Sequence, residues 1–223
     1  DLPQFIKKAI SLPHIKLIGI GCNLACFGGI KPDSKNMREL SELVGLLEKE
    51  FHIDLKIISG GNSANYEWYK SVQGVGRINN LRLGESILLG CETLNRKAIP
   101  GLHTGAFQLI AEVIESKRKS SVPIRETCED AFGNIPRFQD RGIHQRVLIA
   151  LGRQDIPVSS FKFNNHLEIL GSSSDHIILD SGNYNFQVGD EVRFNLDYGG
   201  LLAVMTSPFI RKQFLNCNDH MAA

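Results

Sequence analysis

Three short polar segments in the first ninety residues have the residue types of an anion-binding site: Gly21-Cys22-Asn23, Gly60-Gly61-Asn62-Ser63 and Arg82-Leu83-Gly84-Glu85. Glycines allow backbone N–H groups to approach an anion closely, and a serine hydroxyl can donate a hydrogen bond to it. Each segment alone also fits an ordinary turn, with Ser63 as a helix N-cap. Two glycine-bearing segments beside an arginine, however, are more typical of a pocket for a phosphorylated cofactor.

The sequence indicates no metal site and no disulfide framework. None of the three segments contains the cluster of Cys, His and Asp that a metal ion needs. The chain has five cysteines, and none of them forms a Cys-x-x-Cys pair. Because five is an odd number, at least one of them cannot join an intrachain disulfide. We therefore predict reduced thiols and a cytoplasmic protein.

The elements that must position these segments alternate between strand and helix. Residues 16–21, 54–60 and part of 80–90 are apolar runs that predict buried strands. Residues 33–51 predict an amphipathic helix, and residues 64–72 predict a short one. This order implies parallel strands joined by helical crossovers. Since ligands bind at the C-terminal ends of such strands, we expect the three polar segments to converge there.

A second domain follows. From about residue 103 the pattern changes to short runs that are β-branched or alternate in polarity, with turn residues between them. This pattern is typical of an antiparallel β domain. Pro100-Gly101 marks the linker, and we place the boundary near residues 95–104. The predicted fold class is α/β, with part of a parallel barrel or open sheet in residues 1–100 and a β domain in residues 101–223.

The composition excludes several classes of protein. Hydrophobic residues make up 42% and charged residues 22% of the chain, and the net charge of +1 gives no indication of a nucleic-acid partner. The longest apolar runs fall far short of the ~20 residues that span a bilayer, so we expect no membrane partner. No signal peptide opens the chain. Asp1-Leu2-Pro3 enters a helical pattern without an initiator methionine, as in a chain from which an upstream part has been removed.

The order of the motifs indicates a family. The chain resembles the alanine/ornithine racemases, which are fold-type III pyridoxal-phosphate (PLP) enzymes, in GIGCNLACFGG (19–29), IISGGNS (57–63), INNLRLGESILLG (78–90), DAFGN (130–134), ALGRQD (150–155), ILGSSSDHIILD (169–180) and VGDEVRFNLDYGGLLAVMTSPFI (188–210). The resemblance implies the C-terminal two-thirds of such an enzyme: the last three or so units of a PLP-binding (β/α)8 TIM barrel, then a β domain. It also implies an amino-acid substrate and a homodimer with shared active sites.

The family's phosphate-binding residues can be carried over where the motifs match. Ser63 resembles the phosphate-binding serine of the next-to-last barrel strand. Gly84 and Glu85 match the backbone donors that follow the last strand. Tyr198, in the DYGGLL segment, resembles the tyrosine of the C-terminal domain that reaches the phosphate.

Two further residues resemble contacts to the cofactor's ring. Asn23 lies where related enzymes place a residue, often histidine, against the ring or its hydroxyl. Arg82 matches the arginine that faces the pyridine nitrogen. Because arginine stays protonated, it leaves that nitrogen neutral. A neutral ring withdraws electrons less strongly, which favours quick reprotonation and therefore racemisation over transamination or decarboxylation.

Racemisation needs an acid/base group on each face of the α-carbon, and the sequence departs from the family at both. No strand resembles the one that carries the Schiff-base lysine, and Lys16 and Lys56 stand at the starts of their strands, the wrong end for an active site. The motif that usually holds the second group, a tyrosine, reads Ala131-Phe132-Gly133, and phenylalanine cannot exchange a proton. Asp130 is a candidate catalytic substitute, a contact for a cationic substrate, or a structural residue.

Arg153, Asp155 and Asp175 are candidate substrate contacts, because they resemble residues in segments that face the partner's pocket in family dimers. The alternative for all three is turn chemistry between β-strands. Together with Asp130, the two aspartates indicate a basic amino acid such as ornithine or lysine.

Three hypotheses for the function stay open. In the first, the full-length protein is a PLP-dependent amino-acid racemase, and this fragment alone lacks racemase activity because it lacks the lysine. In the second, the protein binds PLP or regulates its supply without turnover, which Phe132 keeps open. In the third, the chain is a stable truncated product with neither activity, although the exposed edges of an incomplete parallel sheet argue against such a soluble monomer.

Overall fold

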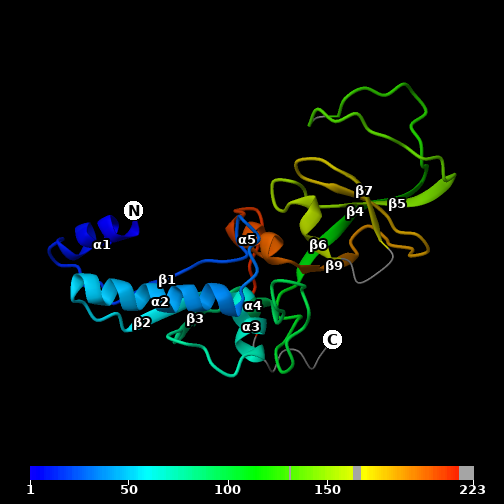
Figure 1. Cartoon of the computed structure of the whole chain (residues 1–223). Helices are drawn as coiled ribbons and strands as arrows, with labels where there is room; N and C mark the ends of the chain where they lie inside the picture. Colours follow the sequence, from blue (N-terminus) through cyan, green and yellow to red (C-terminus); the bar gives the residue numbers. More distant parts are fainter. Residues whose placement is uncertain (131, 163–166, 216–223) are drawn as a thin grey trace. The chain divides into compact units, whose positions relative to one another are not determined.

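The computed structural model describes residues 1–130, 132–162 and 167–215, and the chain forms two compact units, Asp1–Ala106 and Phe107–Ala223 (Figure 1). This division and the boundary predicted near residues 95–104 both fall in the connection between helix α4 (Glu85–Leu89) and strand β4 (Leu109–Ser120). Ala131, in the motif that departs from the family, lies outside the described residues.

The first unit contains a parallel sheet in the order β1-β2-β3, formed by Gly19–Gly21, Ile57–Asn62 and Asn80–Arg82. β1 is in register with β2 from Gly19 opposite Ile57 to Gly21 opposite Ser59. β3 pairs with the other edge of β2, where Asn62 lies opposite Arg82. Because the strands are parallel, their C-terminal ends lie together, as the alternation of elements predicts.

Helix α2 (Ser34–Phe51) is the main crossover between β1 and β2. It begins with a capping box, in which the Asp33 carboxylate accepts from the N–H of Asn36 and the Asn36 amide oxygen accepts from the N–H of Asp33. It ends at His52, in the left-handed region. Its buried apolar face packs into a core with α1 (Leu2–Ile10), β2 and α3 (Tyr66–Ser71), which follows the 3-10 helix η1 (Ser63–Asn65) after β2. The buried members of this core are Ile6, Met37, Leu40, Val44, Leu47, Leu55, Ile58, Trp68 and Ile78.

The second unit contains an antiparallel sheet in the order β6-β9-β4-β5-β8-β7. Its central pair is β4 and β5 (Ile143–Ile149), and the other strands are β6 (Phe161–Lys162), β7 (Glu168–Ser172), β8 (Ile177–Asp180) and β9 (Glu191–Leu196). Side chains alternate along β4, so Leu109, Ala111 and Val113 point into the core while their neighbours are exposed. The predicted α/β fold class, with a parallel part followed by an antiparallel β domain, is confirmed.

Two helices of the second unit were not predicted from its alternating runs. Helix α5 (Tyr198–Thr206) begins after Asp197, whose carboxylate accepts from the N–H of Gly200, and its Val204 joins the core under the sheet. The short 3-10 helix η2 (Val158–Ser160) precedes β6. Among the described residues, no helix has the length and apolar character needed to cross a membrane.

Candidate functional site

Ser63 is the centre of the predicted anion site. It follows β2 directly and is buried. Its hydroxyl oxygen accepts hydrogen bonds from the N–H of Gly84 at 3.2 Å, from the N–H of Ser86 at 3.1 Å and from the Ser86 hydroxyl at 3.1 Å. Three donors from the connection between β3 and α4 therefore point at one oxygen beside the end of β2. Donors that converge in this way suit an oxyanion such as a phosphate.

Gly61 shows why the turn before Ser63 is rich in glycine. Its φ is +142°, and a Cβ on Gly61 would lie 2.1 Å from the side-chain oxygen of Asn65. Any other residue would displace the buried Asn65 amide, whose nitrogen donates to the carbonyl of Gly60 at 2.8 Å. Glycine here lets β2 turn sharply into η1 and so places Ser63 at the strand end.

Glu85 contacts the rest of the site through its side chain and not through its backbone N–H. The structure places its carboxylate in an ion pair with Arg96, in the loop that follows α4. The N–H groups that reach the Ser63 hydroxyl are those of Gly84 and Ser86, on either side of Glu85. Glu85 therefore lies at the predicted turn and ties it to the next loop.

Arg82, the last residue of β3, joins all three strand ends. One guanidinium nitrogen donates to the hydroxyl of Ser59 on β2, and another donates to the carbonyl of Cys22 after β1 at 2.8 Å. The Cys22 thiol donates to the carbonyl of Gly60 at 3.0 Å. Burial raises the pKa of this thiol, and the positive charge of Arg82, which lowers the pKa, only partly offsets that effect. The thiol is therefore neutral, and the charge at these strand ends is that of the guanidinium.

Asn23 meets the other strand ends through Asn62. The side-chain nitrogen of Asn62 donates to the side-chain oxygen of Asn23 at 2.7 Å and to the carbonyl of Leu24 at 2.8 Å. The side-chain oxygen of Asn62 accepts from the N–H of Ala64 at 2.8 Å. The structure thus brings together five of the six predicted cofactor-binding residues, namely Asn23, Ser63, Arg82, Gly84 and Glu85.

Sequence reasoning gave no role of their own to three participants: Ser59, Asn62 and Ser86. All three lie inside the quoted motifs IISGGNS and INNLRLGESILLG, and Asn62 and Ser86 each stand next to a predicted residue, which was the available signal. Ser59 is not next to a predicted residue, and its hydroxyl reaches Arg82 across the sheet between strands that are distant in sequence.

In the second unit, Asp130 and Arg153 lie close together. The Arg153 guanidinium lies 3.6 Å from the centre of the Phe132 ring. The Asp130 carboxylate accepts from the N–H groups of Asn134 and Phe132 and from the Asn134 amide. These hydrogen bonds, Asn134 first, and the charge of Arg153 lower the Asp130 pKa. Asp130 therefore stays ionised, which favours a role as a charged acceptor over proton exchange.

Asp175 joins this cluster through the segment that ends β7. The N–H of Arg153 donates to the carbonyl of Ser173 at 3.0 Å, and its guanidinium donates to the Ser172 hydroxyl at 2.7 Å. The Asp175 carboxylate accepts from the Ser173 hydroxyl and lies 3.0 Å from the His176 ring nitrogen Nδ1. Both contacts, Ser173 first, lower the pKa of Asp175.

Asp155 and Tyr198 occupy different environments. Asp155 is buried, and its two carboxylate oxygens accept from the Ser207 hydroxyl at 3.0 Å and from the N–H of Gly152 at 3.2 Å. It therefore holds the turn that carries Arg153 against the end of α5. Tyr198 begins α5, and its side chain is half-exposed.

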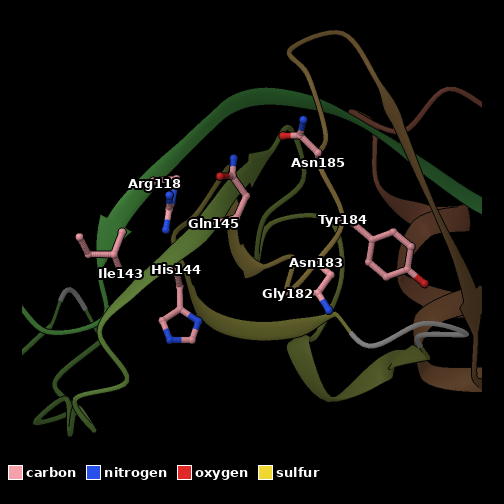
Figure 2. A pocket seen from close by; sticks show the side chains of 8 residues that line it. All are labelled: Arg118, Ile143, His144, Gln145, Gly182, Asn183, Tyr184 and Asn185. Carbon is pink, nitrogen blue, oxygen red and sulfur yellow. The ribbon is translucent and has the colours of Figure 1, made fainter.

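Surface hollows do not by themselves reveal the predicted site. A hollow of about 480 Å³ in the second unit, shown in Figure 2, contains none of the predicted site residues; it is lined by Arg118, Ile143, His144, Gln145, Gly182, Asn183, Tyr184 and Asn185. A hollow of about 250 Å³ in the first unit is lined by Asn23 and the loop that follows it. Within the described ranges, no group of three or more His, Cys, Asp or Glu side chains is placed to hold a metal ion.

Comparison with known sequences identifies relatives. The chain is 42% identical over 218 residues to an ornithine racemase of Acetoanaerobium sticklandii, a match that covers 96% of this chain and 62% of that protein. It is 40% identical over 200 residues to a lysine racemase of Thermotoga maritima, covering 89% of this chain and 56% of that protein. The chain therefore spans about three-fifths of the length of these relatives. No family model matches it.

Comparison with solved structures identifies the fold. An alanine racemase from a D-cycloserine-producing Streptomyces lavendulae superposes with a TM-score of 0.62 at 15% identity, covering 100% of this chain and 62% of that one. An alanine racemase from Bartonella henselae, solved with covalently bound pyridoxal phosphate, gives a TM-score of 0.54 at 19% identity, covering 93% and 56%. These comparisons confirm the resemblance that the motifs indicate: the chain is a homologue of ornithine and lysine racemases and has the fold of alanine racemases.

Proposed function

We propose that the protein containing this chain is a PLP-dependent racemase of a basic amino acid. The observation that carries the proposal is the convergence of Ser63, Gly84, Ser86 and Arg82 at one end of a parallel sheet. The names of the two relatives, ornithine racemase and lysine racemase, support the substrate class. In this proposal the parallel sheet is the last part of a TIM barrel.

The residues present fit a phosphorylated pyridine cofactor. The N–H groups of Gly84 and Ser86 already point at one oxygen, that of the Ser63 hydroxyl, which is the arrangement a phosphate oxygen requires. We propose that Ser63, Gly84 and the turn at Glu85 hold the phosphate, and that Tyr198 of the second unit reaches it. When bound, PLP supplies a ring that withdraws electrons from the substrate's α-carbon and so makes its proton acidic.

Arg82 is proposed to face the pyridine nitrogen. Its guanidinium is held by the Ser59 hydroxyl and the Cys22 carbonyl, so its orientation is set before any ligand arrives. Because a guanidinium keeps its protons, Arg82 leaves the ring nitrogen unprotonated. The ring then withdraws electrons less strongly, so the deprotonated α-carbon of the substrate is short-lived and takes up a proton quickly. This favours proton return, and therefore racemisation, over loss of another group.

The acid/base groups are proposed to come from two places. Lys16 and Lys56 are exposed residues that precede β1 and β2, at the opposite end of the sheet from Ser63. We propose that the lysine is supplied by a part of the protein outside these 223 residues. Asp130 is ionised and holds the Phe132 turn, so we propose that it attracts a cationic substrate instead of exchanging the proton.

The Asp130, Arg153 and Asp175 cluster is proposed to bind the substrate. The two carboxylates suit the side-chain ammonium of ornithine or lysine, and Arg153 suits the α-carboxylate. Asp155 acts on this cluster by holding the turn that carries Arg153.

We further propose that the cluster completes the active site of a partner subunit in a homodimer. The long connection between β4 and β5 exposes Ile124 (95%), Ile135 (74%) and Phe138 (48%), as an interface segment does. A protomer can in this way lend its substrate cluster to the strand-end site of its partner.

The test uses the protein expressed from its complete gene. We expect it to purify with a PLP absorbance band near ~420 nm and to racemise L-ornithine and L-lysine faster than L-alanine, measured by chiral chromatography. Bound PLP without racemisation of any of the three would favour the non-catalytic, PLP-homeostasis alternative. A protein that binds no PLP would require the proposal to be withdrawn.

A further inference from the structure

The side-chain amide of Asn62 has one possible orientation. Its two polar ends contact backbone groups whose roles are fixed: the carbonyl of Leu24 can only accept a hydrogen bond, and the N–H of Ala64 can only donate one. The nitrogen of Asn62 must therefore face Leu24, and its oxygen must face Ala64.

The orientation of Asn62 determines that of Asn23. The atom of Asn23 that lies 2.7 Å from the Asn62 nitrogen must be an acceptor, so it is the Asn23 side-chain oxygen. The Asn23 side-chain nitrogen therefore points away from Asn62, and it has no hydrogen-bond partner among the residues that the structure describes. Asn23 also lines the hollow of about 250 Å³ beside the end of β1. The network leaves two N–H donors of Asn23 for a ligand.

We propose that Asn62 is a positioning residue that turns Asn23 so that it presents an amide N–H, and not its carbonyl, to the ring oxygen of PLP. This inference rests on the proposed function and deepens it. The ring oxygen of PLP is negative once its hydroxyl has lost its proton, and a donor stabilises that form while an acceptor destabilises it. Because Asn62 also binds the N–H of Ala64, next to Ser63, it couples the ring contact to the phosphate contact.

The other charged or titratable side chains at these strand ends are Arg82, Cys22, Glu85 and Cys26, which lines the same hollow as Asn23. The Arg82 guanidinium donates to Ser59 and to the carbonyl of Cys22, and burial raises the pKa of the Cys22 thiol, so the thiol stays neutral. Glu85, the first residue of α4, is ion-paired with Arg96 in the loop that follows α4. The variants below leave these four side chains unchanged, so a difference in midpoint between variants reports the changed side chain.

The test replaces Asn62 with aspartate in the full-length protein loaded with PLP. Asn62→Asp keeps an oxygen for the N–H of Ala64 but puts its other oxygen against the carbonyl of Leu24 and the oxygen of Asn23. We expect the Asn23 amide to rotate by about 180° and donate to the new carboxylate, which turns the Asn23 oxygen toward the ring. The pH midpoint of the absorbance change of bound PLP should then rise by about one unit, a tenfold increase in proton affinity.

Asn79→Asp is the matched control. The Asn79 amide also bridges backbone groups, accepting from the N–H of Ile58 at 2.8 Å and donating to the carbonyl of Lys56 at 2.7 Å. It does so at the start of β2, at the opposite end of the strand from Asn62. We expect Asn79→Asp to lower the melting temperature without moving the PLP midpoint.

A second variant, Asn23→Asp, tests the same inference if Asn62→Asp does not fold. Asn23→Asp can still accept from Asn62, but it presents an oxygen to the ring in place of the N–H donors. It should therefore raise the midpoint in the same direction. An unchanged midpoint in a folded Asn62→Asp or Asn23→Asp protein that keeps its PLP would overturn the inference while leaving the proposed function intact. A wild-type protein that binds no PLP would instead overturn the proposed function, and the inference with it.

Discussion

At the residue scale, Arg82 is held by hydrogen bonds to neutral groups. The hydroxyl of Ser59 and the carbonyl of Cys22 fix the guanidinium, and in the described part of the chain it forms no ion pair. Neutral partners orient the charge without cancelling it. The positive field therefore stays available to a ligand at the strand ends, where the proposal places the pyridine nitrogen.

Under the proposed function, Arg82→Ala should weaken PLP retention or change the reaction outcome in the full-length protein. Loss of a charged hydrogen-bonding group is worth about 2 kcal/mol, so we expect racemisation to fall roughly ten- to a hundredfold. Stopped-time chiral chromatography and the absorbance spectrum of bound PLP check this. Arg77→Ala is the control, because Arg77 is an exposed arginine that pairs with Glu48 away from the site. Unchanged spectra and rates in Arg82→Ala would count against the pocket assignment.

Asp155 and Asp175 are expected to respond differently to substitution, because Asp155 is a buried structural carboxylate and Asp175 is an exposed, proposed substrate contact. Asp155→Ala leaves the Ser207 hydroxyl and the Gly152 N–H without their acceptor, so we expect about 2 kcal/mol lower unfolding free energy in urea. Asp175 is 67% exposed, and Asp175→Ala should change stability by less than about 0.5 kcal/mol. It should instead lower kcat/KM for ornithine severalfold, because a carboxylate that attracts the substrate is lost. Equal stability losses in both variants would contradict this division.

At the scale of an element, the loop that follows α4 is organised around one buried carboxylate. Glu92 is 2% exposed, and it accepts from the N–H groups of Leu94, Asn95 and Lys97 at distances of 2.7 to 3.0 Å. Burial alone raises its pKa, but the hydrogen bonds from Lys97, Asn95 and Leu94 together outweigh burial and lower it. The same loop carries Arg96, the partner of Glu85. Folding of this loop thus supports the turn beside Ser63.

The lowered pKa of Glu92 predicts how stability depends on pH. A carboxyl whose pKa is lower in the folded state stabilises the fold above its unfolded value of about 4.3, and this contribution is lost as pH falls through the folded value. Glu92→Gln should therefore lower unfolding free energy by about 1–2 kcal/mol at about pH 7, and the difference from wild type should shrink below about pH 4. Urea titrations at both pH values measure it. Glu42→Gln, on the exposed face of α2, should show no such difference at either pH.

At the scale of the whole molecule, the two units carry different parts of the proposed active site. The strand-end site lies in the first unit, and the Asp130, Arg153 and Asp175 cluster lies in the second. If the second unit of one protomer serves the first unit of its partner, two different inactive variants can restore a complete site when they are mixed.

Hybrid dimers test that arrangement. Arg82→Ala and Arg153→Ala, each expected to keep about a tenth or less of wild-type activity in this proposal, are unfolded together and refolded as a mixture. Half of the dimers should be hybrids with one intact site of two, so we expect about a quarter of wild-type activity. A mixture that stays as inactive as either variant would show that sites are not shared, and sedimentation of the wild type would report whether a dimer forms at all.

Local pattern was enough to predict most elements of the first unit, but not helix α4 (Glu85–Leu89), because residues 80–90 predicted a strand and a turn. The leucine spacing of residues 33–51 predicts α2 because a period of about 3.6 residues reports one buried face, and the strand–helix order predicts parallel pairing of β1, β2 and β3. Once pairing is parallel, the ends of successive strands must meet, so the convergence of Ser63, Gly84 and Arg82 also follows from the sequence. Helix α5 was not predicted, since its residues are apolar on all sides and show no periodicity.

Tertiary packing, in contrast, determines which polar groups form hydrogen bonds with one another. Ser59 reaches Arg82, and Asn62 reaches Asn23, across sequence separations of 23 and 39 residues. Asp155 is buried against Ser207, 52 residues away, whereas Asp175 stays exposed. A hydrogen bond forms only when packing sets the distance between two groups to within a few tenths of an ångström, and no residue type or spacing encodes that distance. The amino-acid pattern therefore specifies the elements and the order of the strand ends, while packing selects the partner, and so the role, of each side chain.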